Sequence, residues 1–146
     1  MMTPAYEEIY LPYTKDSLAS MLDYAVYDCK YDGAEFLQMF VASGIASEFE
    51  IGSPKYIVGM SGIELARKII ETVTDDTSFP DPNQPTLFRS EEYWIGWILA
   101  EYQWYSGYSF KEIIQKLTYD TVFGMYRKYH EIDPRHFYEA ADKYFQ

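Results

Sequence analysis

One acidic side chain lies inside the most aromatic segment of the chain, where it could do acid–base chemistry. The segment EEYWIGWILAEYQWYSGYSF, residues 91–110, contains all three tryptophans and places Glu101 in an otherwise apolar run. At about 100° per residue, Glu101 shares a helix face with Trp94 and Trp97. A carboxyl group that is desolvated among indole rings can keep its proton near neutral pH and act as a general acid.

A structural role for Glu101 is the competing interpretation, and it is the one we favour. Buried carboxylates are usually paired or hydrogen-bonded, and one of the sixteen tyrosines or an arginine could serve here. Trp94, Trp97 and Glu101 are nevertheless a candidate pocket. A small-ligand-binding protein or an enzyme that uses this pocket is one alternative function, and it requires an open cavity beside Glu101.

The other residues that could bind metals or attack substrates do not form a recognisable site. The glycine patterns of nucleotide-binding loops are absent from the sequence. The two histidines, His130 and His136, lie on either side of a predicted helix break, which is not a metal-ligand spacing, and Cys29 is the single cysteine. We expect no catalytic residue, no metal and no cofactor, and we expect that the protein is not an enzyme.

The charge of the chain indicates which partners it can bind. Its 23 acids oppose 12 Lys and Arg, a formal net charge of −11, and the excess lies mostly before residue 101. Such a surface repels phosphate backbones, so we expect no direct binding of nucleic acid. It suits a basic protein partner, or serves solubility alone. An alternative function that also fits this charge is an acidic inhibitor, which mimics the charge of nucleic acid and so blocks a host or phage enzyme.

The ends and the apolar runs of the sequence bear on its location. The N-terminus, MMTPAYEEIYLPY, lacks the basic and apolar regions of a secretory signal. No segment reaches the roughly 18 apolar residues of a membrane helix, so we expect no membrane partner. A lone cysteine suits a reducing compartment, and we expect a cytoplasmic protein.

Helical periodicity runs through almost the whole chain. In 15–31 the apolar residues recur at helical spacing, and similar patterns follow at 33–44, 61–74, 91–107, 110–117, 118–131 and 134–145. Residues with good N-cap side chains stand directly before most of these segments: Asp32, Ser61, Ser90, Ser109, Thr118 and Asp133. The only strand-like stretch is KYIVGM, residues 55–60, a candidate short β segment.

These patterns predict an all-α fold. The segment 93–105 is apolar on nearly every side and too short to span a membrane, which is typical of a core helix. We therefore expect a single compact domain over 1–146, with about six or seven helices around a central, buried, tryptophan-rich helix. The Pro-rich stretch DDTSFPDPNQPTLFRS, residues 75–90, is predicted to be a long connection within that domain.

The polar face of the first helix is the candidate partner-binding surface. Opposite its apolar stripe, helical geometry gathers aspartates that could pair with basic groups and tyrosines of the kind enriched at interfaces. These residues are Asp16, Asp23, Tyr24, Tyr27 and Tyr31. The alternative is that the tyrosines pack under a neighbouring helix or loop of the same chain.

Three segments carry a resemblance to a known family. They are YDGAEFLQMFVASGIASEFEIGSPKYIVGMSGIELA, EEYWIGWILAEYQWYSGYSFKEI and MYRKYHEIDPRHF. Over roughly 15–140 the chain resembles an uncharacterised family of small acidic bacterial proteins, whose genes lie near genes for predicted ADP-ribosyltransferase toxins. The resemblance carries no catalytic residue or cofactor. It implies a binding role, as an antitoxin or immunity-type protein that neutralises a protein partner, such as a toxin encoded nearby.

Overall fold

The structure is a computed structural model that describes residues 3–82 and 89–146, and every regular element in these ranges is helical. The expected all-α class is therefore confirmed. The α-helices are α1 Leu11–Tyr27, α2 Gly33–Ala42, α3 Ile45–Glu50, α4 Pro54–Ile57, α5 Gly62–Thr74, α6 Glu91–Ser106, α7 Phe110–Lys116, α8 Tyr119–Tyr129 and α9 Pro134–Asp142. Two 3₁₀ turns, η1 Glu8–Tyr10 and η2 Lys143–Phe145, flank them.

Six helix starts lie where their predicted capping residues place them. Each of the six predicted N-caps accepts a backbone N–H of its own first turn. Ser61 and Glu64 form a full capping box at the start of α5, with hydrogen bonds in both directions. At the other end of α6, Gly107 takes a φ of 74°, the left-handed conformation that favours glycine after a helix.

Two predictions about the elements need correction. The first helix, expected over 15–31, is α1, which begins at Leu11 and ends at Tyr27. The stretch 55–60 is not a β segment, because Pro54 starts the short helix α4, which runs to Ile57. The count of six or seven helices matches the helices with seven or more residues in the described ranges, and α3 and α4 are additional short turns of helix. No helix in those ranges is both long enough and apolar enough to cross a membrane.

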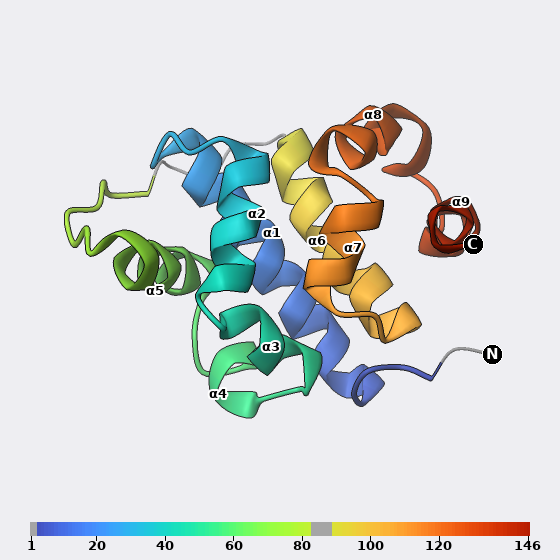
Figure 1. Ribbon diagram of the computed structural model, residues 1–146, viewed down its shortest axis with the longest axis horizontal. Helices are drawn as coiled ribbons and strands as arrows, with labels where there is room; N and C mark the ends of the chain where they lie inside the picture. The colour runs from blue at the N-terminus through green and yellow to red at the C-terminus, as the bar shows by residue number, and fades with distance from the viewer. Residues whose placement is uncertain (1–2, 83–88) are drawn as a thin grey trace.

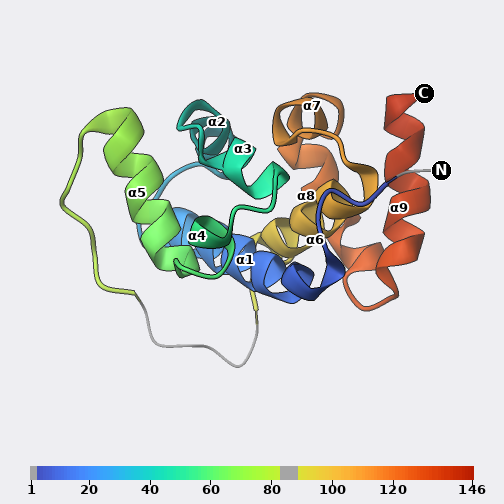
Figure 2. The same cartoon turned by 90° about the horizontal axis from the view of Figure 1, so that it is seen from below.

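The helices form two layers with additional helices at both ends. Figures 1 and 2 show α1 and α6 side by side in the rear layer, with α2, α3 and α7 packed in front of them. At one end α5 lies against α1, and at the other end α8 and α9 pack on α6. The tryptophan helix α6 is thus central, as expected. Of its three indoles only Trp94, 6% exposed, is buried, whereas Trp97 and Trp104 are half-buried.

Small residues let α1 make very close contacts with both of its neighbours. A Cβ at Gly96 of α6 would lie 2.2 Å from the Leu18 carbonyl oxygen and 2.9 Å from the Cα of Ala19. A Cβ at Gly62 of α5 would lie 2.4 Å from the carbonyl oxygen of Ser17. Real Cβ atoms do not approach backbone this closely. The rear layer therefore depends on glycine at both positions.

Hydrogen bonds to α1 and α5 hold the first half of the predicted Pro-rich connection. The Pro80 carbonyl oxygen accepts from the Tyr24 hydroxyl at 2.6 Å and from the Arg67 guanidinium at 3.1 Å. Residues 75–82 contain no regular element. The second half of the predicted connection, at 83–88, lies outside the described residues.

Substitution of Gly96 by alanine tests the close approach of α1 and α6. We expect Gly96→Ala to lower the free energy of unfolding by about 3 kcal/mol, because the methyl group must push two backbones apart. The matched control is Gly124→Ala in α8, where a Cβ meets no atom within 4 Å and should stabilise by about 0.5–1 kcal/mol. Thermal unfolding followed by circular dichroism measures both. Equal effects at the two glycines would contradict this packing.

Candidate functional site

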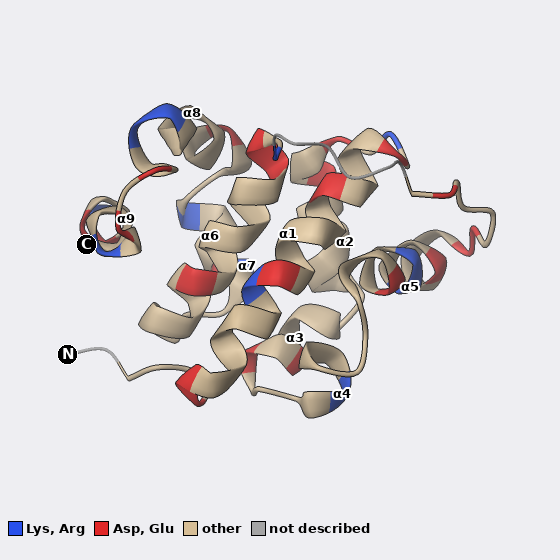
Figure 3. Ribbon diagram, turned by 180° about the vertical axis from the view of Figure 1, so that it is seen from behind, with Lys and Arg blue, Asp and Glu red and all other residues tan. Residues whose placement is uncertain are grey.

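The predicted partner-binding residues of α1 differ in their exposure. Asp16 is exposed and Tyr27 is 42% exposed, while Asp23 and Tyr31 are half-buried. Asp16, Asp23 and Tyr27 follow one another at helical spacing along the rear of α1. Figure 3 shows this side of the molecule, with acidic segments on α1 and at the start of α6. This part of the predicted surface is accessible to a partner.

Tyr24 needs correction as a partner-binding residue. It is 2% exposed, and its hydroxyl lies between the Pro80 carbonyl and Arg67. The reason is that α1 packs against α5 as well as α6. Two faces of α1 are therefore covered, and fewer of its residues are exposed than a helix with one apolar stripe would leave. For this tyrosine, the alternative of packing within the chain is the correct one.

Two carboxylates lie together beside Tyr27, and we call this cluster the acidic niche: Asp23, Tyr27, Ser90, Glu92 and Tyr119. Asp23 accepts a hydrogen bond from the Ser90 hydroxyl, and Glu92 accepts one from the Tyr119 hydroxyl at 3.3 Å. The Tyr119 ring lies directly against Gly33 at the start of α2. The niche thus stands where α1 ends and α2, α6 and α8 begin.

No cation of the described residues neutralises the niche. Glu92 is 7% exposed, its second carboxylate oxygen has no hydrogen-bond partner, and neither it nor Asp23 takes part in an ion pair. Burial raises the pKa of Asp23, and the charges of Asp28 and Glu92 raise it further. Glu92 lies in the first turn of α6, where the helix dipole offsets part of its cost. Buried charges are normally paired. The negative charge of this pair of carboxylates that the helix dipole does not offset is therefore left without a countercharge from the described residues.

An aromatic pocket lies next to the niche, between the first turns of α6 and the end of α8. Its volume is about 260 Å³, and it is open to solvent. The lining is mostly aromatic, and we use the name aromatic pocket for these residues: Arg89, Ser90, Tyr93, Trp94, Trp97, Tyr126 and His130. Ser90 belongs to both features, so the pocket and the acidic niche share a wall.

The predicted pocket at Trp94, Trp97 and Glu101 is corrected at one residue. Both tryptophans line the aromatic pocket, but Glu101 does not. Glu101 is 5% exposed and accepts from the Lys15 ammonium at 3.2 Å, and that ammonium lies 3.8 Å from the Trp97 ring centre. Glu101 is paired, as the structural interpretation holds, but its partner is a lysine from α1.

The histidine of the pocket and the single cysteine have ordinary structural contacts, and the described residues offer no metal site. Within the described ranges, no group of three or more His, Cys, Asp or Glu is placed to hold a metal ion. Nδ1 of His130 lies 2.7 Å from the carbonyl oxygen of Tyr126, and its Nε2 lies 3.3 Å from the Glu131 carboxylate. Burial raises the pKa of the Cys29 thiol, which disfavours the thiolate form that nucleophilic attack requires.

Part of each feature could not be identified from the sequence. Glu92 and Tyr119 of the niche were not singled out, and neither were Arg89, Tyr93 and Tyr126 of the pocket. One signal was present: Arg89 and Glu92 lie beside the cap residue Ser90 at the start of the tryptophan helix. The contribution of α8 has no signal in sequence spacing, because it depends on how α8 folds back onto α6.

No family model, no curated protein and no solved structure matches the chain.

Removal of Lys15 tests the pairing of Glu101. We expect Lys15→Met to lower the free energy of unfolding by about 2–4 kcal/mol, because it leaves Glu101 buried without a cation. Lys15→Met combined with Glu101→Gln should recover most of that loss. Urea unfolding of the four proteins of this double-mutant cycle gives the coupling energy. Losses that simply add would show that the two side chains do not interact.

A pH series tests the raised pKa of Asp23. Because the folded-state pKa lies above the ordinary value of 3.8, the folded protein binds this proton more tightly than the unfolded chain. The stability contributed by Asp23 is thus fully present below about pH 3.8 and is lost as the pH rises through the folded-state pKa. We expect Asp23→Asn to gain stability relative to wild type as the pH rises from about 4 to 7. Urea unfolding at each pH measures the difference, and a constant difference would contradict the shift.

Proposed function

We propose that the protein is a non-enzymatic binding module for a basic protein partner, and that the partner docks on the rear of α1 and on the acidic niche. The observation that carries the proposal is the pair of carboxylates, Asp23 and Glu92, for which the described residues supply no cation. A partner's Lys or Arg beside them would provide the missing countercharge. Charge-assisted hydrogen bonds of this kind are among the strong polar contacts at interfaces.

The surroundings of the niche support the same partner chemistry. Tyr27 is 42% exposed beside it, and Tyr13 is 53% exposed on the same side of α1. Between them Asp16 is exposed as well. Tyrosines with exposed rings give rigid contact area, and the aspartates favour basic groups. The formal net charge of −11 would also accelerate encounter with a basic partner.

The resemblance of the sequence supplies a concrete partner for this proposal. We propose an antitoxin or immunity-type role, in which the module covers a basic region of a toxin encoded nearby and so neutralises it. The proposed setting is the cytoplasm. The nucleic-acid-mimicking inhibitor stays a prediction. Figure 3 shows acidic segments spread over η1, α1, α5 and α6.

Co-expression with the products of neighbouring genes tests the proposal. We expect the tagged protein to co-purify with one of them and to relieve its toxicity. Glu92→Gln removes the charge and keeps an acceptor for Tyr119, so the free protein should remain folded. Loss of one member of a desolvated ion pair should weaken the complex by at least about 2 kcal/mol, roughly thirtyfold in Kd.

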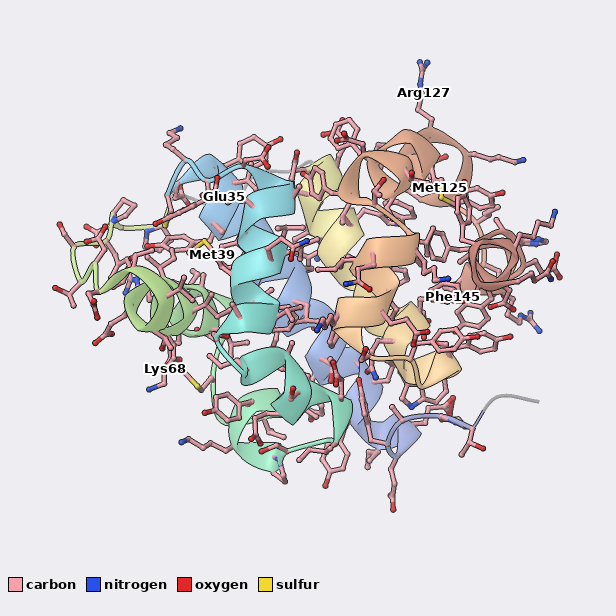
Figure 4. All side chains as sticks on the ribbon, in the orientation of Figure 1. Glu35, Met39, Lys68, Met125, Arg127 and Phe145 are labelled. Atoms are coloured by element: carbon pink, nitrogen blue, oxygen red, sulfur yellow. The ribbon has the colours of Figure 1, made fainter. Side chains whose placement is uncertain are left out.

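The matched control removes the same charge elsewhere. Glu35 is exposed on α2, in the front layer, and is labelled in Figure 4. Glu35→Gln should change Kd by less than about threefold. If no neighbouring product binds or loses its toxicity, the proposed function is wrong. If one binds but Glu92→Gln binds it as tightly as wild type, the acidic niche is not the docking site.

A further inference from the structure

We propose that the aromatic pocket binds a small, flat aromatic anion, of which an aromatic carboxylate is the simplest example. This goes beyond the partner-binding function and does not depend on it. The inference rests on the shape of the cavity, on the rings that line it, and on the sign of the charge at its mouth. None of these observations involves the unpaired carboxylates of the acidic niche.

The walls of the pocket are rings held in fixed orientations. Tyr126 and His130, one helical turn apart on α8, are stacked with ring centres 4.0 Å apart and planes 13° from parallel. Trp94 packs edge-to-face against both Tyr126 and Phe137, with ring centres 5.8 and 5.9 Å away. Rings that are ordered before binding lose little freedom when a flat ligand stacks on them.

The size of the pocket sets the size of the ligand. A volume of about 260 Å³ lies just below the range of roughly 300–1,000 Å³ that is typical of sites for drug-sized molecules. The pocket therefore suits a ligand of one ring or two fused rings with a small substituent. Its openness to solvent leaves room for a polar group of the ligand to remain at the mouth.

The charged group that lines the pocket is a cation. Arg89 is exposed at the mouth, with its guanidinium 4.5 Å from the centre of the Tyr93 ring. None of the 23 acids of the chain lines the cavity. A guanidinium on an aromatic floor, with no hydrogen bond to another described residue, matches a ligand that carries a carboxylate next to a ring.

The opposite choice, a cationic ligand, is disfavoured by the same residues. The chain's own cations already lie on two of the ring faces, Arg89 on Tyr93 and Lys15 on Trp97. A cationic ligand would have to displace Arg89. Three carboxylates lie behind the lining residues. Asp23 accepts a hydrogen bond from Ser90, burial and, to a lesser extent, the charge of Asp16 raise the pKa of Tyr93, and Glu131 contacts His130. They weaken the attraction for an anion, so we expect millimolar to high-micromolar affinity.

Titration of the full chain with benzoate tests the proposal. The three tryptophans give three indole N–H resonances in a ¹H–¹⁵N spectrum, and Trp97→Phe and Trp104→Phe assign them. We expect benzoate to shift the Trp94 and Trp97 resonances in a saturable manner. Trp94 is a sensitive reporter because no acceptor among the described residues binds its Nε1–H. Trp104, whose Nε1 donates to the Tyr6 carbonyl at 2.7 Å, serves as the internal reference.

Two related compounds and two variants separate the parts of the inference. Benzamide, which lacks the charge, and cyclohexanecarboxylate, which lacks the flat ring, should each bind at least about tenfold more weakly than benzoate. Arg89→Gln should weaken benzoate binding by about tenfold. The control Arg127→Gln removes the same charge from α8, and Figure 4 shows Arg127 extending away from the body of the protein. It should leave benzoate binding unchanged.

The proposal is overturned by any of three results. One is the absence of a saturable shift at Trp94 and Trp97 at millimolar benzoate. Another is equal binding of benzoate and either related compound. The third is a loss in Arg127→Gln as large as the loss in Arg89→Gln, which would assign the effect to net charge instead of the pocket. The indole spectrum of each free variant shows whether it is folded.

Discussion

The crossing of α1 and α6 at Gly96 is the constraint on which both functional features depend. The backbones of the two helices approach so closely that no side chain fits between Gly96 and Leu18–Ala19. Because the helices run in opposite directions, this one contact sets the register along their whole length. Toward one end Lys15 meets Glu101, and toward the other Asp23 meets Ser90. A wider crossing would separate both pairs.

The same register explains why polar contacts between α1 and α6 lie on both sides of the apolar contact at Gly96. Near Gly96 the contact is made by buried apolar residues such as Ala19, Leu22 and Ile95. One or two turns away from Gly96, polar side chains of the two helices meet across the seam, as Lys15 meets Glu101 and Asp23 meets Ser90. The aromatic pocket and the acidic niche both lie toward the end of the crossing where α6 begins, and α8 contributes residues to each. Neither feature belongs to one helix alone.

The sequence predicts the helices and their starts well, and it predicts poorly which helices pack against one another. Capping depends on residues within one turn, so Ser61 with Glu64, and Ser90 by itself, predict their helix starts correctly. The exposure of Tyr24 and the partner of Glu101 depend on which helices flank α1, and that is set by glycines at 62 and 96 whose role appears only in three dimensions. Glycine inside a helical pattern was a usable signal of such close packing.

The two buried carboxylates of α6 differ in the groups that balance their charge. Glu101 and Glu92 are similarly buried, at 5% and 7% exposed. Glu101 has a cation from its own chain, since Lys15 reaches it across the seam, and the ammonium also covers Trp97. Glu92 has hydroxyl groups near it and no such cation among the described residues. A carboxylate that served only stability would be improved by a cation or by an apolar replacement. The proposed basic partner would supply the cation that Glu92 lacks beside the exposed Tyr27.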